Sequence, residues 1–178
     1  MAIENIIQSV RSYLFTEEGA NAFAILDGAS VDDLLERLYQ HQPEYVCLYP
    51  GDLEPDMAEV APYLVCLDPG SAFTNWVIEH GWGNHWGIFA LSLADLRTMR
   101  QHFRKFILVF NDGQPFYFRY YDPRVLRVYL PTCNAEELAT FFGQVECYLL
   151  EADAREDPDT ALRFQVVSDS LQQEKLLL

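Results

Sequence analysis

The stretch AFAILDGASVDDLLERLYQHQPEYVCLY (22–49) decides the fold prediction, because its hydrophobic pattern changes twice. Residues 22–26 form an unbroken apolar run stopped by an Asp-Gly pair, which is typical of a buried strand that ends in a turn. Residues 31–41 follow with apolar side chains at helical spacing. The run 45–49 then has the pattern of a second strand. Strand, helix and strand in this order predict a right-handed crossover unit.

The same alternation continues to residue 106. Apolar runs at 63–67 and 85–91 predict two further strands, and apolar residues at helical spacing predict helices over 73–80 and 93–106. Because a helix follows each strand, neighbouring strands are expected to run in the same direction. We therefore predict an α/β fold with a mixed, largely parallel sheet flanked by helices.

The pattern changes after residue 106. Two apolar runs, FILVF (106–110) and FYFRYY (116–121), flank an Asn-Asp-Gly turn, which is a strong signal for a β-hairpin. We therefore predict an antiparallel β-hairpin near 107–121. Caps and apolar spacing predict helices within 1–21 and at 31–41, 123–130 and 135–143. Ser30 and Asn134 are the predicted N-caps of the helices at 31–41 and 135–143, Pro123 is the predicted start of the helix at 123–130, and Gly143 is the predicted stop of the last helix. Strand-like runs follow at 145–152 and 162–167 around an acidic loop at 154–160, and the tail at 171–178 forms a frayed helix or packs on the fold.

Length and composition indicate one soluble domain. A chain of 178 residues can bury a single core, so residues 1–178 are expected to fold as one unit. Half of the residues are hydrophobic and 14% are aromatic, which excludes an intrinsically disordered chain. Cys47, Cys66, Cys133 and Cys147 lack metal-site spacing, so we interpret them as free thiols of a reducing compartment. With no signal peptide or membrane-spanning run in the sequence, we expect a cytoplasmic protein.

The formal net charge is −15, from 27 acidic and 12 basic residues. An excess of negative charge repels phosphate backbones and anionic lipid headgroups, so we exclude nucleic acid and membranes as partners. The densest positive stretch contains Arg97, Arg100, Arg104 and Lys105. Their spacing places these side chains on one face of a helix, which we interpret as a solvated surface.

Common enzyme motifs are missing from the sequence, including the glycine-rich nucleotide loops, the nucleophile elbow and the zinc-protease pattern. Asp27, His85 and a cysteine could form a small hydrolase, but Asp27 followed by Gly28 is explained more simply as a turn. Glu79, His80 and His85 could be drawn as metal ligands, but they lack the spacing of a metal motif. We therefore expect no catalytic residue, no metal and no cofactor.

The run FYFRYYDPR (116–124) is the least ordinary part of the chain. Alternation along a strand places aromatic side chains on both of its faces, so the fold or a partner must cover both. Arg119 or Arg124 could pair with Asp122 and fix the turn that follows. They could instead take part in a protein interface, where Tyr and Arg are enriched.

Longer segments occur in a specific order: AFAILDGA, EYVCLYPG, APYLVCLDP, NWVIEHGWGNHWGIF and FYFRYYDPRVLRVYLPTC. In this order they resemble the adaptor family of bacterial type VI secretion, whose members are also called effector chaperones. The resemblance covers about residues 22–143, and its most specific pieces are WGIF (86–89) and FRYYDPRVL (118–126). Residues 144–178 form a C-terminal extension.

This resemblance implies a bacterial cytoplasmic protein that binds a secreted effector and helps load it onto the spike protein, without enzymatic activity. Its hallmark positions and the neighbouring aromatic residue are the predicted partner-binding residues: Trp86, Arg119, Tyr121, Asp122 and Arg124. Two other functions stay open, an immunity protein that inhibits a cognate toxin and the small hydrolase described above. Strong acidity would suit an immunity protein that covers a basic active site.

Overall fold

The computed structural model describes residues 2–16, 19–153, 155, 157 and 159–178. Its helices are α1 (Ala2–Leu14), α2 (Leu34–His41), α3 (Pro55–Glu59), α4 (Ala72–Gly81), α5 (Leu96–Arg104), α6 (Pro123–Tyr129), the 3₁₀ turn η1 (Leu130–Thr132) and α7 (Ala135–Phe142). Its strands are β1 (Asn21–Asp27), β2 (Tyr45–Cys47), β3 (Pro62–Leu67), β4 (Gly87–Ser92), β5 (Leu108–Asn111), β6 (Gln114–Tyr117), β7 (Cys147–Glu151), β8 (Thr160–Val167) and β9 (Ser170–Leu177). Parts of the predicted N-terminal helix segment (residues 1, 17 and 18) and of the acidic loop (residues 154, 156 and 158) lie outside the described residues.

The main sheet has seven strands in the order β2-β3-β1-β4-β7-β8-β9. Each pair of neighbouring strands in it is antiparallel. The chain combines helices and strands as expected, but the prediction of a largely parallel sheet is wrong. No helix in the described part of the chain is both long enough and apolar enough to span a membrane.

The helical connections explain the error in strand direction. β1 and β2 both pair antiparallel with β3, which lies between them, so the β1–α2–β2 connection does return the chain in the same direction. β3 and β4 are related in the same way across β1. Each crossover therefore skips one position, and an antiparallel strand occupies that position. A strand–helix–strand pattern indicates the direction of two strands but not which strand lies between them.

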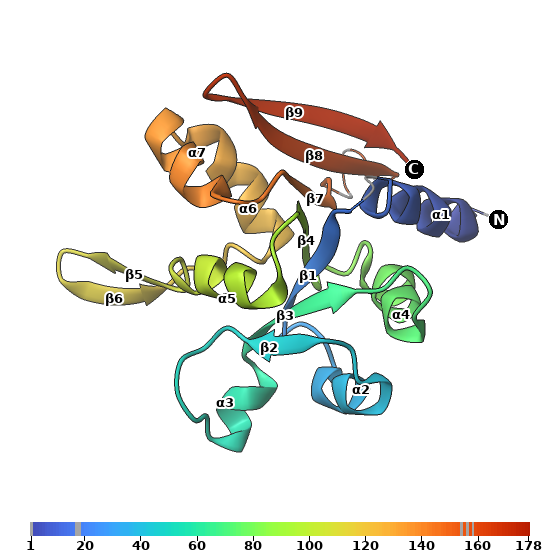
Figure 1. Cartoon of the computed structure of the whole chain (residues 1–178), viewed down its shortest axis with the longest axis horizontal. Helices are drawn as coiled ribbons and strands as arrows, with labels where there is room; N and C mark the ends of the chain where they lie inside the picture. Colours follow the sequence, from blue (N-terminus) through green and yellow to red (C-terminus); the bar gives the residue numbers. More distant parts are fainter. Residues whose placement is uncertain (1, 17–18, 154, 156, 158) are drawn as a thin grey trace.

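Helices cover both faces of the main sheet (Figure 1). On β1, Phe23 and Ile25 belong to the core under α5, α6 and α7. The alternate residues Ala22, Ala24 and Leu26 belong to the core under α1, α2 and α4. Because neither face of β1 meets water, the strand is an unbroken apolar run instead of an alternating one.

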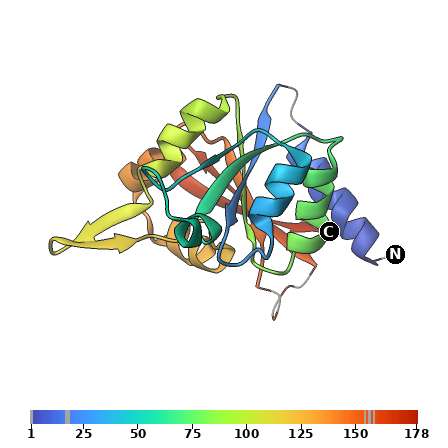
Figure 2. The same cartoon turned by 90° about the horizontal axis from the view of Figure 1, so that it is seen from below.

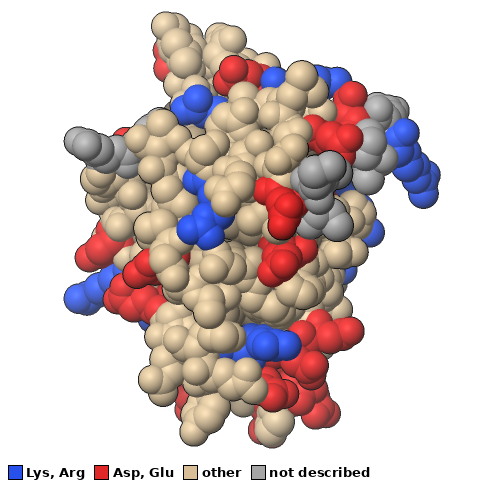
Figure 3. Space-filling view, turned by 90° about the vertical axis from the view of Figure 1, so that its right-hand side faces the viewer, with Lys and Arg blue, Asp and Glu red and all other residues tan. Residues whose placement is uncertain are grey.

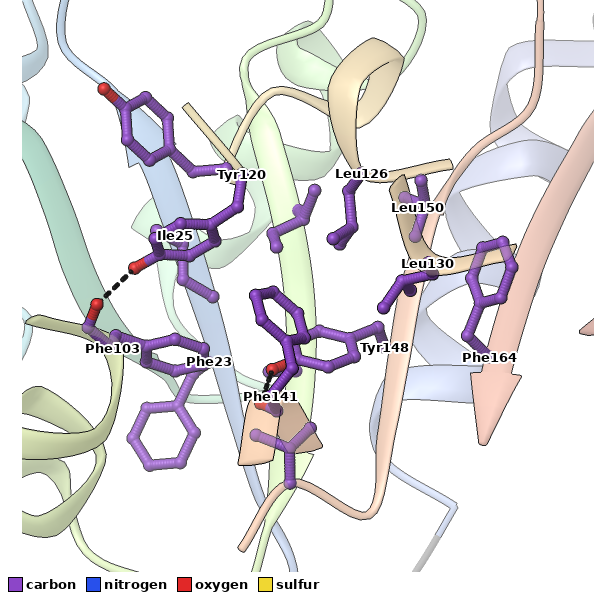
Figure 4. Packing of buried hydrophobic residues seen from close by; sticks show 14 of the residues in the cluster. Phe23, Ile25, Phe103, Tyr120, Leu126, Leu130, Phe141, Tyr148, Leu150 and Phe164 are labelled. Carbon is purple, nitrogen blue, oxygen red and sulfur yellow. Dashed lines mark hydrogen bonds between the residues drawn. The ribbon is translucent and has the colours of Figure 1, made fainter. Parts of the chain in front are cut away.

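The core on the α5–α7 side contains many aromatic rings (Figure 4). Tyr120 and Tyr148 are fully buried, and their hydroxyls donate hydrogen bonds to the carbonyl oxygens of Phe103 and Phe141, at 3.0 Å in each case. Burial raises the pKa of both phenols well above the ordinary value, so they stay protonated and remain donors. Because both hydroxyls have partners, their burial leaves no unsatisfied polar group.

Side-chain caps determine several helix ends. Asn134 forms a capping box at the start of α7, and Gly143 caps its C-terminus, so both predictions are confirmed. The prediction for Ser30 is wrong, because α2 begins only after Asp33. The Ser30 hydroxyl instead donates a hydrogen bond to Asp27 and stabilises the turn after β1.

The C-terminal segment completes the main sheet. β7 pairs with β4, β8 pairs with β7, and β9 pairs with β8, which confirms the two predicted strand-like runs. The tail forms β9, so the alternative of a frayed helix is wrong. Leu176 is buried in the core on the α1 side, whereas the next residue, Leu177, is exposed. The tail is therefore an edge strand that packs within this fold.

β5 and β6 form a separate two-stranded ribbon, which confirms the predicted hairpin. The ribbon extends away from the rest of the molecule (Figures 1 and 2). Its second strand ends at Tyr117, because Tyr120 and Tyr121 turn into the core and are buried there. The predicted strand at 116–121 is therefore too long.

Candidate functional site

Most of the predicted site residues lie near one end of the main sheet. β1 ends there at Asp27, β4 begins there after Trp86, and β7 ends there at Glu151, because β4 runs antiparallel to both neighbours. The Asp27 amide donates to the Trp86 carbonyl at 2.8 Å. The segment 119–124 reaches the same end through an ion pair between Arg119 and Asp27.

Asp27 is a buried carboxylate, with 1% of its surface exposed. The Ala29 amide donates to it at 3.1 Å and the Ser30 hydroxyl donates to it at 2.8 Å, in addition to the guanidinium of Arg119. Gly28 is required in this turn, because a Cβ at that position would lie 2.5 Å from neighbouring backbone carbonyl oxygens. The predicted turn is confirmed, and the buried charge is paired and hydrogen-bonded.

Arg119 connects the segment after the hairpin to β1. The hydrogen bond to Asp27 raises the pKa of its guanidinium, and about half of the Arg119 side chain is exposed. Beside it, the buried Tyr121 shares a side-chain hydrogen bond with Tyr49, and burial raises the pKa of the Tyr121 phenol. The Tyr49 ring also contacts the Tyr117 ring, with 5.2 Å between centroids. These contacts attach the base of the hairpin to the main sheet.

Asp122 and Arg124 form a bidentate ion pair. Nε of Arg124 donates to Oδ1 of Asp122 at 3.0 Å, and Nη2 donates to Oδ2 at 2.7 Å. The Arg124 amide donates to Oδ1 at 2.9 Å, so Asp122 is also the N-cap of α6, which begins at Pro123 as predicted. Burial alone would raise the pKa of Asp122, but the hydrogen bonds from Arg124 outweigh it and lower the pKa. The pair stabilises the start of α6, while half of the Arg124 side chain stays exposed.

Trp86 does not join this cluster. Its ring packs on the opposite face of the sheet, against α4, where it contacts Trp76 at 4.8 Å between centroids and stacks on His80. Tyr121 belongs to the core on the other face. The structure therefore brings Arg119, Tyr121, Asp122 and Arg124 together but separates Trp86 from them.

One ion pair at this end of the sheet was missed by the sequence interpretation. Glu151 pairs with His85 and accepts a hydrogen bond from the Gly83 amide at 2.5 Å. Burial raises the pKa of Glu151, although the charge and hydrogen bond of His85 oppose this shift. The sequence does contain one signal for Glu151, because a charged residue directly follows the apolar run 147–150, and a buried charge needs a partner.

The hairpin contributes a different feature, exposed apolar side chains. The exposed fractions are 42% for Leu108, 38% for Val109, 68% for Phe110, 50% for Phe116 and 57% for Tyr117. We call these five residues the hairpin surface. Contiguous exposed apolar side chains of this size commonly mark contact sites in soluble proteins.

The segment that contains α5 and the hairpin is basic, in contrast to the chain as a whole. Residues 96–121 include five basic side chains but one acidic side chain. Four of the basic residues lie on α5 or directly after it: Arg97, Arg100, Arg104 and Lys105. Figure 3 shows, for comparison, the side of the molecule formed by α1, α4 and the C-terminus, where acidic and basic side chains are interspersed.

Comparison with known protein families identifies the family of this chain. Residues 22–140 match the family model described as "Domain of unknown function (DUF4123)", and this match covers more than half of the chain. The chain belongs to the DUF4123 family. No curated protein and no solved structure matches it.

The DUF4123 match includes the main features of the candidate site. It begins in β1 and ends within α7, so it contains both arginine–aspartate pairs and the hairpin surface. Glu151 and the strands β7, β8 and β9 follow the matched region. Three strands of the main sheet therefore come from residues outside the DUF4123 match, and they pack in the same core.

The residues considered for a hydrolase are divided among different contacts in this DUF4123 protein. Asp27 and His85 belong to separate ion pairs. Burial raises the pKa of the thiols of Cys47, Cys66 and Cys133, which keeps them protonated and poorly nucleophilic at neutral pH. Within the described residues, no group of three His, Cys, Asp or Glu side chains is arranged to bind a metal ion.

Proposed function

We propose that this protein is a non-catalytic adaptor of the bacterial cytoplasm that binds a type VI secretion effector and helps load it onto the spike protein. The ordered segments that resemble type VI adaptors support the proposal, and membership of the DUF4123 family agrees with it. The structural observation that carries it is the hairpin surface, which exposes apolar side chains on a ribbon extending from the body.

The hairpin surface has the chemistry of a protein-binding site. Burial of apolar surface contributes about 25 cal/mol per Å² to association, before the costs of ordering are subtracted. Phe110, Phe116 and Tyr117 are large, exposed aromatic side chains, and aromatic side chains dominate the energy of many interfaces. Because the ribbon extends away from the body, a partner can reach both of its faces.

The ion pairs of Arg119 with Asp27 and of Arg124 with Asp122 can hold the base of the hairpin in place for partner binding. Arg119 pairs with Asp27, and Tyr121 bonds to Tyr49, so the chain that leaves the hairpin has fixed contacts on both sides. A fixed base lowers the conformational entropy that is lost when a partner binds. Arg119 and Asp122 are therefore assigned as positioning residues, and the exposed half of Arg124 is available to the partner.

Co-expression with the products of neighbouring genes tests the proposal. Tagged wild-type protein should co-purify with one effector and with the spike protein, and the complex should survive size-exclusion chromatography. The double variant Phe110→Ser and Phe116→Ser should lose this capture. Tyr39→Ser, which removes an aromatic side chain 78% exposed on α2, is the matched control and should retain it.

The same strains separate the other two functions. An immunity protein would protect cells from the cognate toxin even when the spike gene is deleted. Deletion of an adaptor gene would instead leave the toxin sensitivity of the cells unchanged and abolish secretion of the effector. A hydrolase would show turnover that is lost in Asp27→Asn or His85→Gln. Either result without stable capture of an effector would contradict the adaptor function.

A further inference from the structure

The backbone of the hairpin defines which of its polar groups point outward. Asp112 and Gly113 both have positive φ, 48° and 76°, which is typical of the two-residue turn that joins adjacent antiparallel strands. Asn111 is paired with Gln114 across this turn, and the Phe118 amide donates to the carbonyl of residue 107 at the other end of the ribbon. Between these two positions, residue pairs whose backbone groups bond to the partner strand alternate with pairs whose backbone groups point away from it.

The alternation leaves the two edges of the ribbon unequal. Leu108 is paired with Tyr117 and Phe110 with Pro115, and at both pairs the backbone groups point away from the partner strand. The β5 edge therefore presents the N–H and C=O groups of both Leu108 and Phe110. The β6 edge lacks one donor, because Pro115 has no N–H. Within the described residues, β5 pairs with β6 and with no further strand.

The side chains beside the β5 edge are apolar on both faces of the ribbon. Leu108 and Phe110 share one face with Tyr117, and Val109 shares the other face with Phe116. All five are exposed. A strand added beside β5 would therefore find apolar side chains of the ribbon next to both of its own faces. This holds for either register of the added strand.

Charge restricts the partner further. The segment 96–121 has an excess of four positive charges within a chain of net charge −15, and Arg104 and Lys105 lie just before β5. An added strand would therefore be favoured when acidic residues flank its apolar part. A second copy of this acidic chain meets that requirement poorly, because its own β5 is flanked by Arg104 and Lys105.

We infer that the β5 edge binds an extended apolar segment of the partner protein, flanked by Asp or Glu, as an added β-strand. Main-chain hydrogen bonds at Leu108 and Phe110 supply the pairing, and the side chains of the hairpin surface supply the apolar contact. This inference rests on the proposed adaptor function, for which it names the edge and the chemistry of the bound segment.

Proline substitution separates the backbone contribution from the side-chain contribution. Phe110→Pro removes one outward N–H of β5, and Phe110→Ala removes only the ring. Tyr117→Pro and Tyr117→Ala make the same comparison on the β6 edge. The probe is the neighbouring-gene product that co-purifies with the wild-type protein, and its affinity is measured by calorimetry on the full chain.

Strand addition at β5 predicts that Phe110→Pro binds this probe about tenfold more weakly than Phe110→Ala, whereas the two Tyr117 variants bind alike. Amide hydrogen exchange across residues 106–118 should also slow in the complex at Leu108 and Phe110. Circular dichroism of each variant checks that the main fold is retained.

Other outcomes overturn the inference in distinguishable ways. If wild-type protein captures the probe and the proline and alanine variants are equal at position 110, strand addition is excluded and the adaptor function stands. If the wild-type protein captures no neighbouring-gene product, the adaptor function fails and the inference fails with it. If Phe110→Pro dissociates a homodimer without weakening capture, the β5 edge belongs to a second copy of the chain.

Discussion

The core beneath α5–α7 and the hairpin surface contain the same kinds of side chain in opposite environments. Tyr120 and Tyr148 are fully buried with hydrogen-bonded hydroxyls, whereas Phe110 and Tyr117 are more than half exposed. The boundary falls within FYFRYY (116–121), which begins on the ribbon and ends in the core. Aromatic content alone does not separate residues that stabilise the fold from residues available to a partner.

The largest expected effect is the loss of a ring from the core. Tyr148→Ala should lower the free energy of unfolding by ~3–5 kcal/mol, because it leaves a cavity beside Phe141 and Phe142. Urea titration measures this change. Phe116→Ala on the hairpin is the matched control, with an expected change below ~0.5 kcal/mol. Equal losses would mean that the ribbon packs as part of the core.

The next effect concerns the ion pair between the two regions. Asp27→Ala should lower the free energy of unfolding by ~1–3 kcal/mol, because the Ala29 amide and the Ser30 hydroxyl lose their buried acceptor. The partly exposed Arg119 adds less, since its charge can be solvated. Asp32→Ala removes an exposed carboxylate and serves as the control. If both variants unfold at the same urea concentration, Asp27 does not stabilise the base of the hairpin.

A smaller effect distinguishes the two regions by pH. His102 is buried in the core region, where its Nε2 bonds to the Phe141 carbonyl at 2.9 Å, and burial lowers its pKa below the ordinary 6.5. The folded state therefore disfavours the protonated ring, so this stability is present above about pH 6.5 and is lost as pH falls through the lowered pKa. His102→Gln should reduce the pH dependence of unfolding in that range.

The hairpin supplies the control for this pH measurement. Phe116→Ala leaves His102 untouched and should keep the wild-type slope of unfolding free energy against pH. A wild-type slope in His102→Gln would show that other groups account for the acid sensitivity.

The smallest expected effect on stability lies on the hairpin itself. Phe110→Ser should change the free energy of unfolding by less than ~0.5 kcal/mol, because the ring is already in water in the folded state. It should nevertheless reduce the binding of a hydrophobic fluorescent dye. Leu93→Ser, at a residue outside the hairpin surface that is 67% exposed, should leave dye binding unchanged. Equal dye binding by wild type and Phe110→Ser would mean that the hairpin surface is not a contiguous apolar site.

Local features of the candidate site could be predicted from the sequence. Asp122 and Arg124 are two residues apart, so one turn of chain brings their charges together. The ion pairs Asp27–Arg119 and His85–Glu151 join residues 92 and 66 positions apart, and no local pattern specifies them. Trp86 was grouped with the arginines by motif, but the face of the strand on which its ring lies separates it from them.

The sequence by itself determined most of the elements and some of their ends, since these depend on periodicity and on contacts between near neighbours, but it misplaced the start of α2 and the end of β6. The apolar run of β1, the Asp-Gly turn of the hairpin and the Asn134 cap belong to this class. Only the tertiary structure decided which strands became neighbours, because an antiparallel strand entered each gap left by a crossover. The same packing buried Tyr120 and left Phe110 in water, since burial depends on how residues distant in the chain assemble.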